Sequence, residues 1–351
     1  MKVGLIGCGG IAASHIETYE KLKDVKVVSL CDLNLDLANY FAKKFRVGKT
    51  YSDYPTMFEQ ENLDLVDICT PLSTHKKIVC DAAKRVPAIL LEKPMAMSVA
   101  ECDEIVQTVN KYKTKLCIGH TQLFSPLIQK ARSLVCSNEF DLLSFRTTLK
   151  ASFENLRKFN IAPAWNVLPE QKGIIWEVCC HHAYLQLHFL PDITEIYAVG
   201  KKVNYPVYDD FAVFLRTSDD HFGIIEISWI CRETEVIYEL QSTDGRRLQI
   251  NWEFDYLHEL SEDPPFTYGG VARNMLVDDK RLLQKWIRFI TAYVKKKKRL
   301  PMFNMISSYV DSIKMNLPPP VTPQDGRKTI QLLECIEKSL NTHEPVSMGV
   351  K

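Results

Sequence analysis

The amino-acid sequence predicts an α/β fold with two domains, one over residues 1–120 and the other over residues 121–351. In the first range, short apolar runs alternate with helical segments, and this alternation is typical of a parallel sheet covered by helices. In the second range, apolar runs are separated by turn residues such as Thr243-Asp244-Gly245, which is typical of a large, mainly antiparallel sheet. The chain of 351 residues is long enough for two domains of ordinary size.

A glycine-rich turn follows the first apolar run. Gly7, Gly9 and Ala12 have the spacing G-x-G-x-x-A, and residues 13–22 after them read as a helix. In such a motif the first glycine permits a tight turn, the second lets the backbone approach a pyrophosphate at the helix N-terminus, and the small third residue permits close packing. The motif predicts a Rossmann dinucleotide-binding domain here. The cofactor-binding residues predicted from this turn are Gly7, Cys8, Gly9, Gly10 and Ile11.

Asp32 follows the second apolar run, residues 25–30. A carboxylate in this place can accept hydrogen bonds from the hydroxyls of the adenosine ribose. It would also repel a 2′-phosphate, and the neighbouring Leu33 and Asn34 provide no cation to accept one. NAD is therefore the predicted cofactor, in preference to NADP.

Two further loops follow predicted strands of this domain, residues 65–69 and 88–91. Ligands of parallel sheets bind beyond the carboxyl ends of the strands, so Thr70 and Pro71 are expected beside the nicotinamide half of the cofactor. Lys93 is expected where a cation can orient and polarise a substrate hydroxyl. An exposed loop lysine would be the better interpretation of Lys93 alone, but its coincidence with the glycine motif favours the functional one.

These segments resemble the glucose–fructose oxidoreductase, inositol dehydrogenase and MocA-like (Gfo/Idh/MocA) oxidoreductases. The matching segments are residues 4–12, Asp32, residues 69–71 with His75, residues 92–96, and the closing pattern of residues 324–339 and 345–346. The resemblance implies hydride transfer between NAD(P) and a sugar, cyclitol or related hydroxyl compound. It also implies that Lys93 contacts substrate and nicotinamide, and it adds His75, Glu92 and Pro94 to the expected cofactor site.

Residues 173–190 are apolar almost all round, which predicts one buried helix. Its polar side chains Glu177, His181, Tyr184 and His188 recur at helical spacing and would form one stripe. Because burial of polar groups without partners is costly, the stripe is expected to line a cavity. A fully satisfied internal hydrogen-bond network is the alternative.

Glu177 and His181 occupy the positions of the D-x-x-x-H pair that supplies acid–base chemistry in the family that the chain resembles. Two departures stand beside them: the acid is Glu instead of Asp, and Tyr184 stands where many members carry a second acid. A third is Leu123, where members often have Arg. The expected catalytic residues are Lys93, which would polarise the reacting oxygen, His181, which would exchange its proton, and Glu177, which would orient or tune His181.

This segment allows two other interpretations. A metal site at Glu177 and His181 lacks a third ligand with convincing spacing, so no metal is predicted. His182 is an alternative base, but on a helix its side chain points about 100° away from that of His181.

The second range is expected to open with a linking helix, residues 121–135, and to contain helices over residues 281–294 and 327–340. One face of its antiparallel sheet carries many apolar and aromatic residues, which predicts a homodimer or homotetramer through this sheet.

Composition narrows the class of protein. Forty-four basic residues against 43 acidic ones give a net charge of +1, which predicts neither nucleic acid nor an acidic membrane as a partner. No apolar run is long enough to span a bilayer, and no leader-like segment follows Met1, so a cytoplasmic location is expected. The 11 cysteines contain no C-x-x-C pair and are expected to be reduced thiols.

The predicted function is an NAD-dependent oxidoreductase that acts on a secondary hydroxyl or ketone of a small polyhydroxylated molecule. Two alternatives remain open. One is glycoside hydrolysis with a recycled NAD, which releases no NADH. The other is a regulator that senses the dinucleotide without turnover; the intact Lys93 and His181 argue mildly against it.

Overall fold

The computed structural model describes residues 1–158, 167–251, 256–260 and 300–349. The chain forms two compact units, and each unit draws on segments that are distant in sequence. The first unit comprises Met1–Phe124, Glu170–Tyr184 and Pro301–Glu334, and the second comprises Ser125–Pro169, Leu185–Leu300 and Cys335–Lys351. The predicted boundary between a domain of residues 1–120 and a domain of residues 121–351 stays a prediction. The helix expected over residues 281–294 lies outside the described residues.

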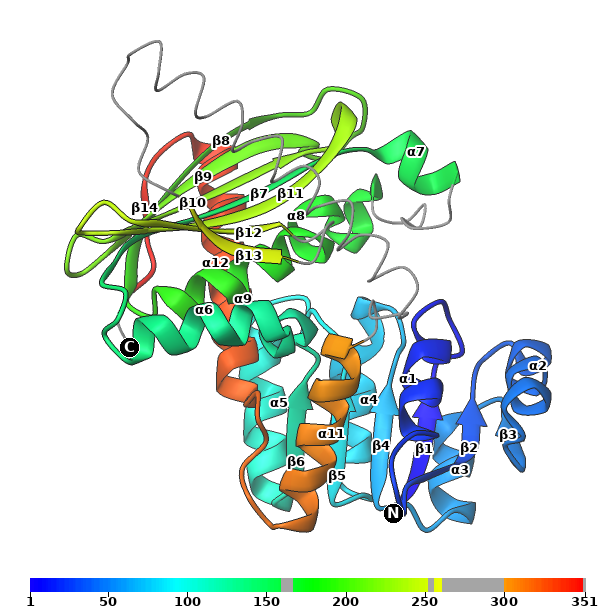
Figure 1. Cartoon of the computed structure of the whole chain (residues 1–351). Coiled ribbons are helices and arrows are strands. Elements are labelled where there is room, and N and C mark those ends of the chain that lie inside the picture. The colour runs from blue at the N-terminus through cyan, green and yellow to red at the C-terminus, as the bar shows by residue number, and fades with distance from the viewer. Residues whose placement is uncertain (159–166, 252–255, 261–299, 350–351) are drawn as a thin grey trace. The chain divides into compact units, whose positions relative to one another are not determined.

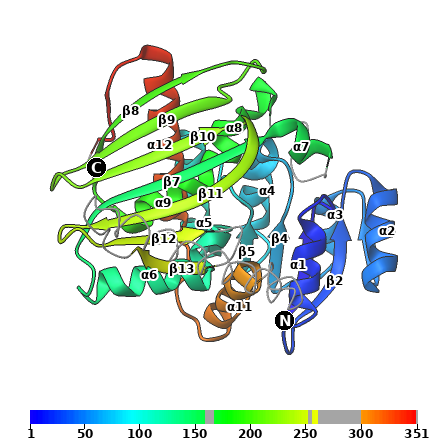
Figure 2. The same cartoon turned by 45° about the horizontal axis from the view of Figure 1, so that its top comes forward.

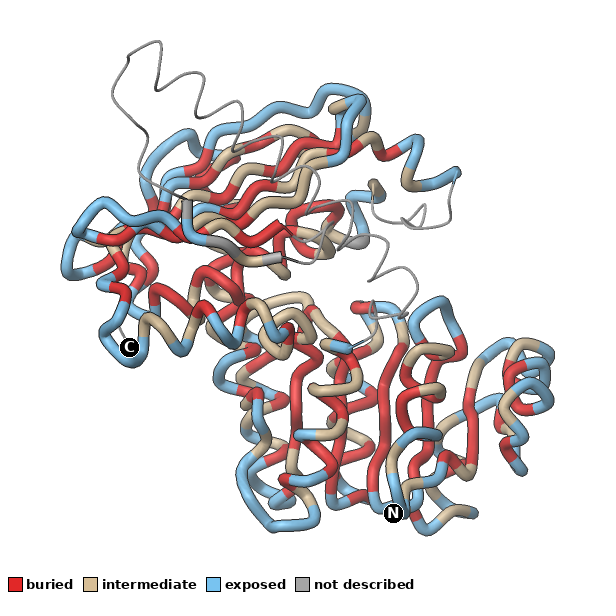
Figure 3. The backbone as a smooth tube through the Cα atoms, in the orientation of Figure 1, coloured by how far each residue is buried: buried red, intermediate tan, exposed pale blue. Residues whose placement is uncertain are grey.

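The first unit is built on a six-stranded sheet with the order β3-β2-β1-β4-β5-β6, in which all neighbouring strands are parallel. The strand order reverses between β1 and β4, and ligands of such sheets bind at this reversal. Strands β4 and β5 are fully buried, as the red tubes of Figure 3 show. The strands are β1 (Lys2–Ile6), β2 (Lys26–Cys31), β3 (Lys49–Tyr51), β4 (Leu65–Ile68), β5 (Ala88–Leu91) and β6 (Lys115–Ile118).

Helices cover both faces of this sheet. The connections between successive parallel strands are right-handed. Because β1 to β2 runs toward one edge of the sheet and β4 to β5 to β6 runs toward the other edge, α1 lies on one face and α4 and α5 lie on the opposite face. Helix α11 lies over β5 and β6 (Figure 1), where the Tyr309 hydroxyl is bonded to the Ile89 and Lys115 carbonyls. The helices are α1 (Ala12–Tyr19), α2 (Leu35–Phe45), α3 (Tyr54–Gln60), α4 (His75–Ala82), α5 (Val99–Tyr112), α8 (Gly173–Glu177) and α11 (Leu300–Lys314).

The second unit contains an eight-stranded sheet with the order β13-β12-β11-β7-β10-β9-β8-β14. Only β7 and β10 are parallel, so the predicted mainly antiparallel sheet is confirmed, and with it the α/β fold class. The strands are β7 (Leu142–Ser152), β8 (Ile193–Lys201), β9 (Asp210–Thr217), β10 (Phe222–Ser228), β11 (Ile230–Ser242), β12 (Arg247–Asn251), β13 (Tyr256–Leu260) and β14 (Val346–Ser347).

Helix α6 (Pro126–Cys136) and the later parts of α9 (Cys179–Phe189) and α12 (Pro323–Thr342), residues 185–189 and 335–342, lie on one face of this sheet (Figure 2). Gln186 of α9 donates to the Phe145 and Ile224 carbonyls, and the Ser339 hydroxyl of α12 accepts from the Ala198 amide. Short helix α7 (Phe153–Lys158) follows β7. No helix in the described part of the chain is both long enough and apolar enough to span a membrane.

The prediction of one helix over residues 173–190 is wrong. Helix α8 ends at Glu177 and α9 begins at Cys179, with Val178 between them. The His181 amide donates to the Val178 carbonyl, three residues back, which is a tighter turn than the α-helix makes. The predicted linking helix also begins late: residues 121–124 form a 3₁₀ turn, and the Ser125 side chain caps α6.

Candidate active site

The glycine-rich turn has the geometry that its sequence predicts. Gly7 has φ +94°, and a Cβ atom there would lie 2.6 Å from the Cys69 carbonyl oxygen, so only glycine fits. At Gly9 and Gly10 a Cβ atom would meet no atom within 4 Å. No hydrogen bond within the described residues uses the amide N–H groups of Gly9 and Gly10. The turn therefore presents open backbone donors just before the N-terminus of α1.

Asp32 is tied to this turn. One carboxylate oxygen accepts from the Cys8 amide at 2.7 Å, and the other accepts from the Asn34 amide at 2.8 Å. Each oxygen keeps a further lone pair, which can accept a ribose hydroxyl. Open amides for a pyrophosphate and a fixed acid for the ribose together fit a dinucleotide such as NAD.

His75 joins the two loops that follow β4 and β5. Its ring nitrogens lie 2.9 Å from the Thr70 carbonyl oxygen and 2.8 Å from the Pro94 carbonyl oxygen. Burial lowers the pKa of His75, and the two backbone carbonyls offset this only in part. The buried ring of His75, which can donate to one of these carbonyls in its neutral form, lies between the loops that carry Thr70, Pro71, Glu92 and Lys93.

Lys93 is anchored by Glu177. The Lys93 Nζ atom donates to Glu177 Oε1 at 2.6 Å and to the Glu177 carbonyl oxygen at 3.1 Å. That carbonyl is available because the helix breaks at Val178. Burial alone would lower the pKa of the Lys93 ammonium, but the Glu177 carboxylate outweighs it and the pKa is raised. An ammonium has three N–H donors, so one remains after Glu177 has taken two.

His181 lies beside Tyr184 instead of Glu177. Its Nδ1 atom is 2.8 Å from the Tyr184 hydroxyl, which also accepts from the Gln122 amide at 3.2 Å. The Tyr184 ring stacks on the His120 ring with centroids 4.3 Å apart. Burial, and next the Lys93 ammonium, lower the pKa of His181 well below its usual range, so the ring is neutral near pH 7.

The predicted polar stripe is therefore only partly formed. The structure does not support the expectation that Glu177 orients or tunes His181, because Glu177 is paired with Lys93 and the pKa of His181 is lowered. His188 belongs to the second unit, where its ring contacts that of Phe189. Lys93, Glu177, His181 and Tyr184 all belong to the first unit.

The sequence reasoning missed a buried charge network behind Lys93. His15 of α1 lies between two carboxylates, with Nδ1 2.7 Å from Asp67 and Nε2 3.0 Å from Glu92. Burial opposes the imidazolium, but Asp67 outweighs it and the pKa of His15 is raised. The other Glu92 oxygen accepts from the Lys93 amide. An acid within the otherwise apolar β4 was the signal that the sequence offered for this network.

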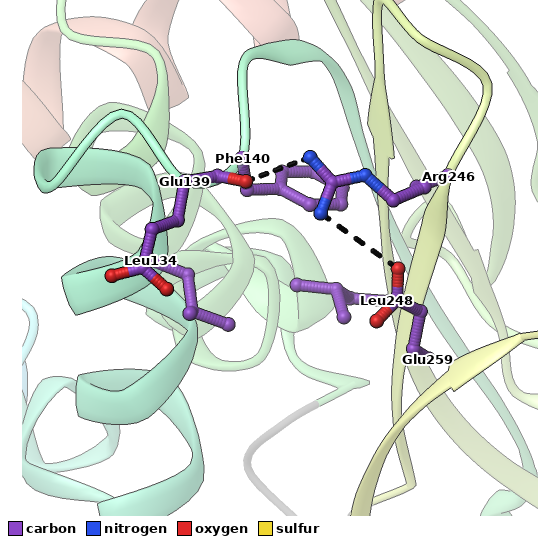
Figure 4. A pocket seen from close by; sticks show the side chains of 6 residues that line it. All are labelled: Leu134, Glu139, Phe140, Arg246, Leu248 and Glu259. Carbon is purple, nitrogen blue, oxygen red and sulfur yellow. Dashed lines mark hydrogen bonds and ion pairs between the residues drawn. The ribbon is translucent and has the colours of Figure 1, made fainter.

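A pocket in the second unit is lined by Leu134, Glu139, Phe140, Arg246, Leu248 and Glu259 (Figure 4). Its one cationic side chain, Arg246, lies over the Phe140 ring, donates to the Glu139 carbonyl at 2.7 Å and faces Glu259 at 3.9 Å. These intramolecular partners already occupy the guanidinium.

Two family models match the chain. The oxidoreductase family with an NAD-binding Rossmann fold (GFO_IDH_MocA) matches residues 1–120, and the GFO/IDH/MocA C-terminal domain matches residues 128–248. The chain belongs to the Gfo/Idh/MocA family of oxidoreductases, as its motifs predict.

Similar curated proteins are distant in sequence. The uncharacterized oxidoreductase YrbE of Bacillus subtilis is 23% identical over 206 residues, which is 58% of this chain and 58% of that protein. D-apiose dehydrogenase of Paraburkholderia graminis is 22% identical over 264 residues, or 74% of this chain and 69% of that one. Glycosyl hydrolase family 109 protein 2 of Phocaeicola vulgatus is 32% identical over 119 residues, which is 32% of this chain and 29% of that protein.

Solved structures with the same fold cover nearly the whole chain. The WlbA dehydrogenase of Bordetella pertussis, in complex with NADH and UDP-GlcNAcA, has a TM-score of 0.81 at 15% identity and covers 100% of this chain and 98% of its own. The scyllo-inositol dehydrogenase of Lactobacillus casei, with bound NAD(H) and scyllo-inositol, has a TM-score of 0.77 at 16% identity and covers 99% of each chain.

Proposed function

We propose that this protein is an NAD-dependent dehydrogenase or reductase that acts on a secondary hydroxyl or ketone of a sugar, cyclitol or related polyol. The observation that carries the proposal is the Lys93 ammonium, held by Glu177 at the carboxyl end of a strand in a dinucleotide-binding sheet. Family membership supports the same reaction, and so do the names of similar proteins, which include dehydrogenases of an apiose and an inositol.

In the proposed site, bound NAD carries the hydride and two side chains, Lys93 and His181, act on the reacting oxygen and its proton. Bound NAD supplies the acceptor or donor of the hydride. The third N–H donor of Lys93 binds the reacting oxygen and stabilises negative charge that develops there. His181, neutral near pH 7, takes the hydroxyl proton when the substrate is oxidised and returns it when a ketone is reduced.

Screening a panel of sugars, cyclitols and sugar nucleotides for NADH formation at neutral pH tests this function. At least one secondary alcohol should give stoichiometric NADH, and Lys93→Met should abolish the signal. NAD binding without turnover of any compound, in either direction, would instead support a dinucleotide-sensing regulator.

A redox-neutral glycoside hydrolase is the second candidate, favoured by the likeness of 119 residues to a family 109 glycosyl hydrolase. Such an enzyme oxidises, eliminates and re-reduces, so the cofactor is regenerated in each turnover. Cleavage of an aryl glycoside without net NADH release would support this candidate over the dehydrogenase.

We also propose that the protein is a cytoplasmic homodimer or homotetramer. All 11 cysteines are free, which supports a reducing compartment. The face of the eight-stranded sheet opposite its helices exposes Tyr197, Val199 and Phe214, and Tyr197 and Phe214 are register partners on adjacent strands. Light scattering after gel filtration should give two or four chains, and Phe214→Glu should lower that number.

A further inference from the structure

Tyr184 stands at the centre of a small aromatic and histidine cluster. Its side chain is only 2% exposed, and its ring stacks on His120, which follows strand β6. The ring of His181 meets that of Tyr184 edge to face, with centroids 5.6 Å apart. Ring stacking and the bond from the Gln122 amide thus fix the place of the Tyr184 hydroxyl independently of His181.

The two nitrogens of His181 are in different situations. Nδ1 is bonded to the Tyr184 hydroxyl, whereas Nε2 has no hydrogen-bond partner among the described residues. His181 is itself partly exposed, although its neighbours on the helix, Cys180 and His182, are buried. Nε2 is therefore the nitrogen available to a substrate.

Three basic side chains act on the charge of His181. Lys93 approaches from the loop after β5, His120 from the end of β6, and His182 from the same helix. Glu177, the carboxylate one helical turn before His181, is paired with Lys93. A tyrosine hydroxyl has a pKa of about 10 and adds no charge at neutral pH, so nothing in this cluster stabilises a resting imidazolium.

We propose that Tyr184 is a positioning residue for His181: its hydroxyl holds the Nδ1 side of the ring, so that Nε2 exchanges the substrate proton, and it does so without adding charge to the site. This inference rests on the proposed function. When a hydroxyl is oxidised, its O–H bond breaks and an Nε2–H bond forms, while the Nδ1–H group donates to the Tyr184 oxygen. Reduction of a ketone returns the same proton from Nε2.

Nitrogen NMR of protein labelled at histidine, loaded with NADH, tests the inference without turnover. His181 is assigned by loss of its signals in His181→Gln. The wild type should show one neutral tautomer of His181 between pH 6 and 8. In Tyr184→Phe, which keeps the ring stacking, the signals should move to a mixture of tautomers. In Tyr184→Glu, the new carboxylate should raise the pKa of His181 by about 1 or more.

The matched control is Tyr208→Phe, which removes a tyrosine hydroxyl bonded to the Leu340 carbonyl in the second unit and should leave the His181 signals unchanged. Unchanged His181 signals in both Tyr184 variants would overturn the inference and leave Tyr184 as a packing residue. Turnover is a separate readout. With the best substrate of the panel, Tyr184→Phe should lower kcat roughly tenfold to hundredfold, a part of the usual acid–base contribution, without changing the KM for NAD.

The two claims fail in different ways. If His181→Gln keeps full turnover, the proposed catalytic role of His181 falls, whereas the NMR response to Tyr184 would still show that Tyr184 positions the ring. If Tyr184→Phe alters the NMR signals but not kcat, positioning by Tyr184 is irrelevant to the reaction, and the inference is overturned in its functional part.

Discussion

Lys93 donates to two oxygens of Glu177, Oε1 and the carbonyl oxygen, and keeps a third donor for the substrate. Lys93→Met should therefore retain NADH binding and lose most turnover. Fluorescence titration with NADH and steady-state kinetics on the same preparation measure the two effects. Loss of NADH binding would move Lys93 from substrate polarisation to cofactor recognition.

Glu177 should act through Lys93 and not through His181. Glu177→Gln removes the carboxylate that outweighs the burial of Lys93, so the pKa of the Lys93 ammonium should fall. The loss of activity at high pH should then begin at a lower pH than in the wild type. The pH dependence of kcat/KM measures this shift. A shift confined to the acidic limb would show that Glu177 acts on His181 after all.

His181 should account for the proton transfer. His181→Ala is expected to lower turnover by roughly 10²–10⁴-fold, the usual contribution of a positioned acid–base group. His182→Ala is the matched control, since His182 is buried on the same helix and burial lowers its pKa to about 3. Normal turnover in His181→Ala together with inactivity in His182→Ala would mean that the wrong histidine has been assigned.

Asp32 should decide between the two dinucleotides. Its fixed carboxylate favours a free ribose hydroxyl and repels a 2′-phosphate, so NADH should bind more tightly than NADPH. Asp32→Ala should narrow the difference between the two dissociation constants. Tighter binding of NADPH to the wild type would contradict this assignment.

Among the elements, α1, β4 and the end of β5 are joined by His15, Asp67 and Glu92. Removing the shared cation leaves two buried carboxylates without compensation, so His15→Ala should lower the free energy of unfolding by about 3–5 kcal/mol. Denaturant unfolding measures this loss. His221→Ala, which removes an exposed pairing with Asp219, should cost under about 1 kcal/mol. Equal costs for the two variants would contradict the network's role.

Elements that follow from local pattern were well predicted. The apolar run of residues 88–91 matches β5, and that of residues 25–30 matches β2 to within one residue, because both are decided by neighbours in sequence. The break at Val178 was not predictable in this way. Its consequence, a Glu177 carbonyl bonded to Lys93, depends on a partner 84 residues away.

In the candidate site too, the residues could be chosen from the local sequence, but their partners could not. Sequence reasoning selected Lys93, Glu177 and His181, which the fold brings into one unit, but it paired the wrong two. A helical wheel relates side chains on one helix and carries no information on which loop approaches it. The His15 network was missed for the same reason, since its three members come from three separate elements.

At the scale of the whole molecule, buried neutral histidines should make the protein sensitive to acid. Burial lowers the pKa of His75, and it lowers those of His120 and His182 to about 3. Below about pH 6.5 the unfolded chain binds protons that the folded chain does not, so each histidine can cost up to about 1.4 kcal/mol per pH unit. The melting temperature should fall steadily between pH 6.5 and 5.

His15 affects the pH dependence of stability in the opposite direction, because its pKa is raised in the folded protein. Its contribution is fully present below about pH 6.5 and is lost as pH rises through the folded pKa. His15→Gln should therefore lower stability most below about pH 6.5 and make the fall of stability on the alkaline side shallower. An unaltered alkaline side in differential scanning fluorimetry would contradict a charged His15.

The hydrogen bond from Lys93 to the Glu177 carbonyl oxygen would persist through side-chain substitutions at residue 177. No substitution can delete a main-chain oxygen, so exchange of the side chain at residue 177 removes only one of the two anchors of Lys93. The interaction depends instead on the number of residues in helix α8. One residue inserted within 173–177 would rotate the chain by about 100° around the helix axis and carry the oxygen away from the ammonium. The lysine's position is thus encoded by the length of a helical segment as much as by any residue within it.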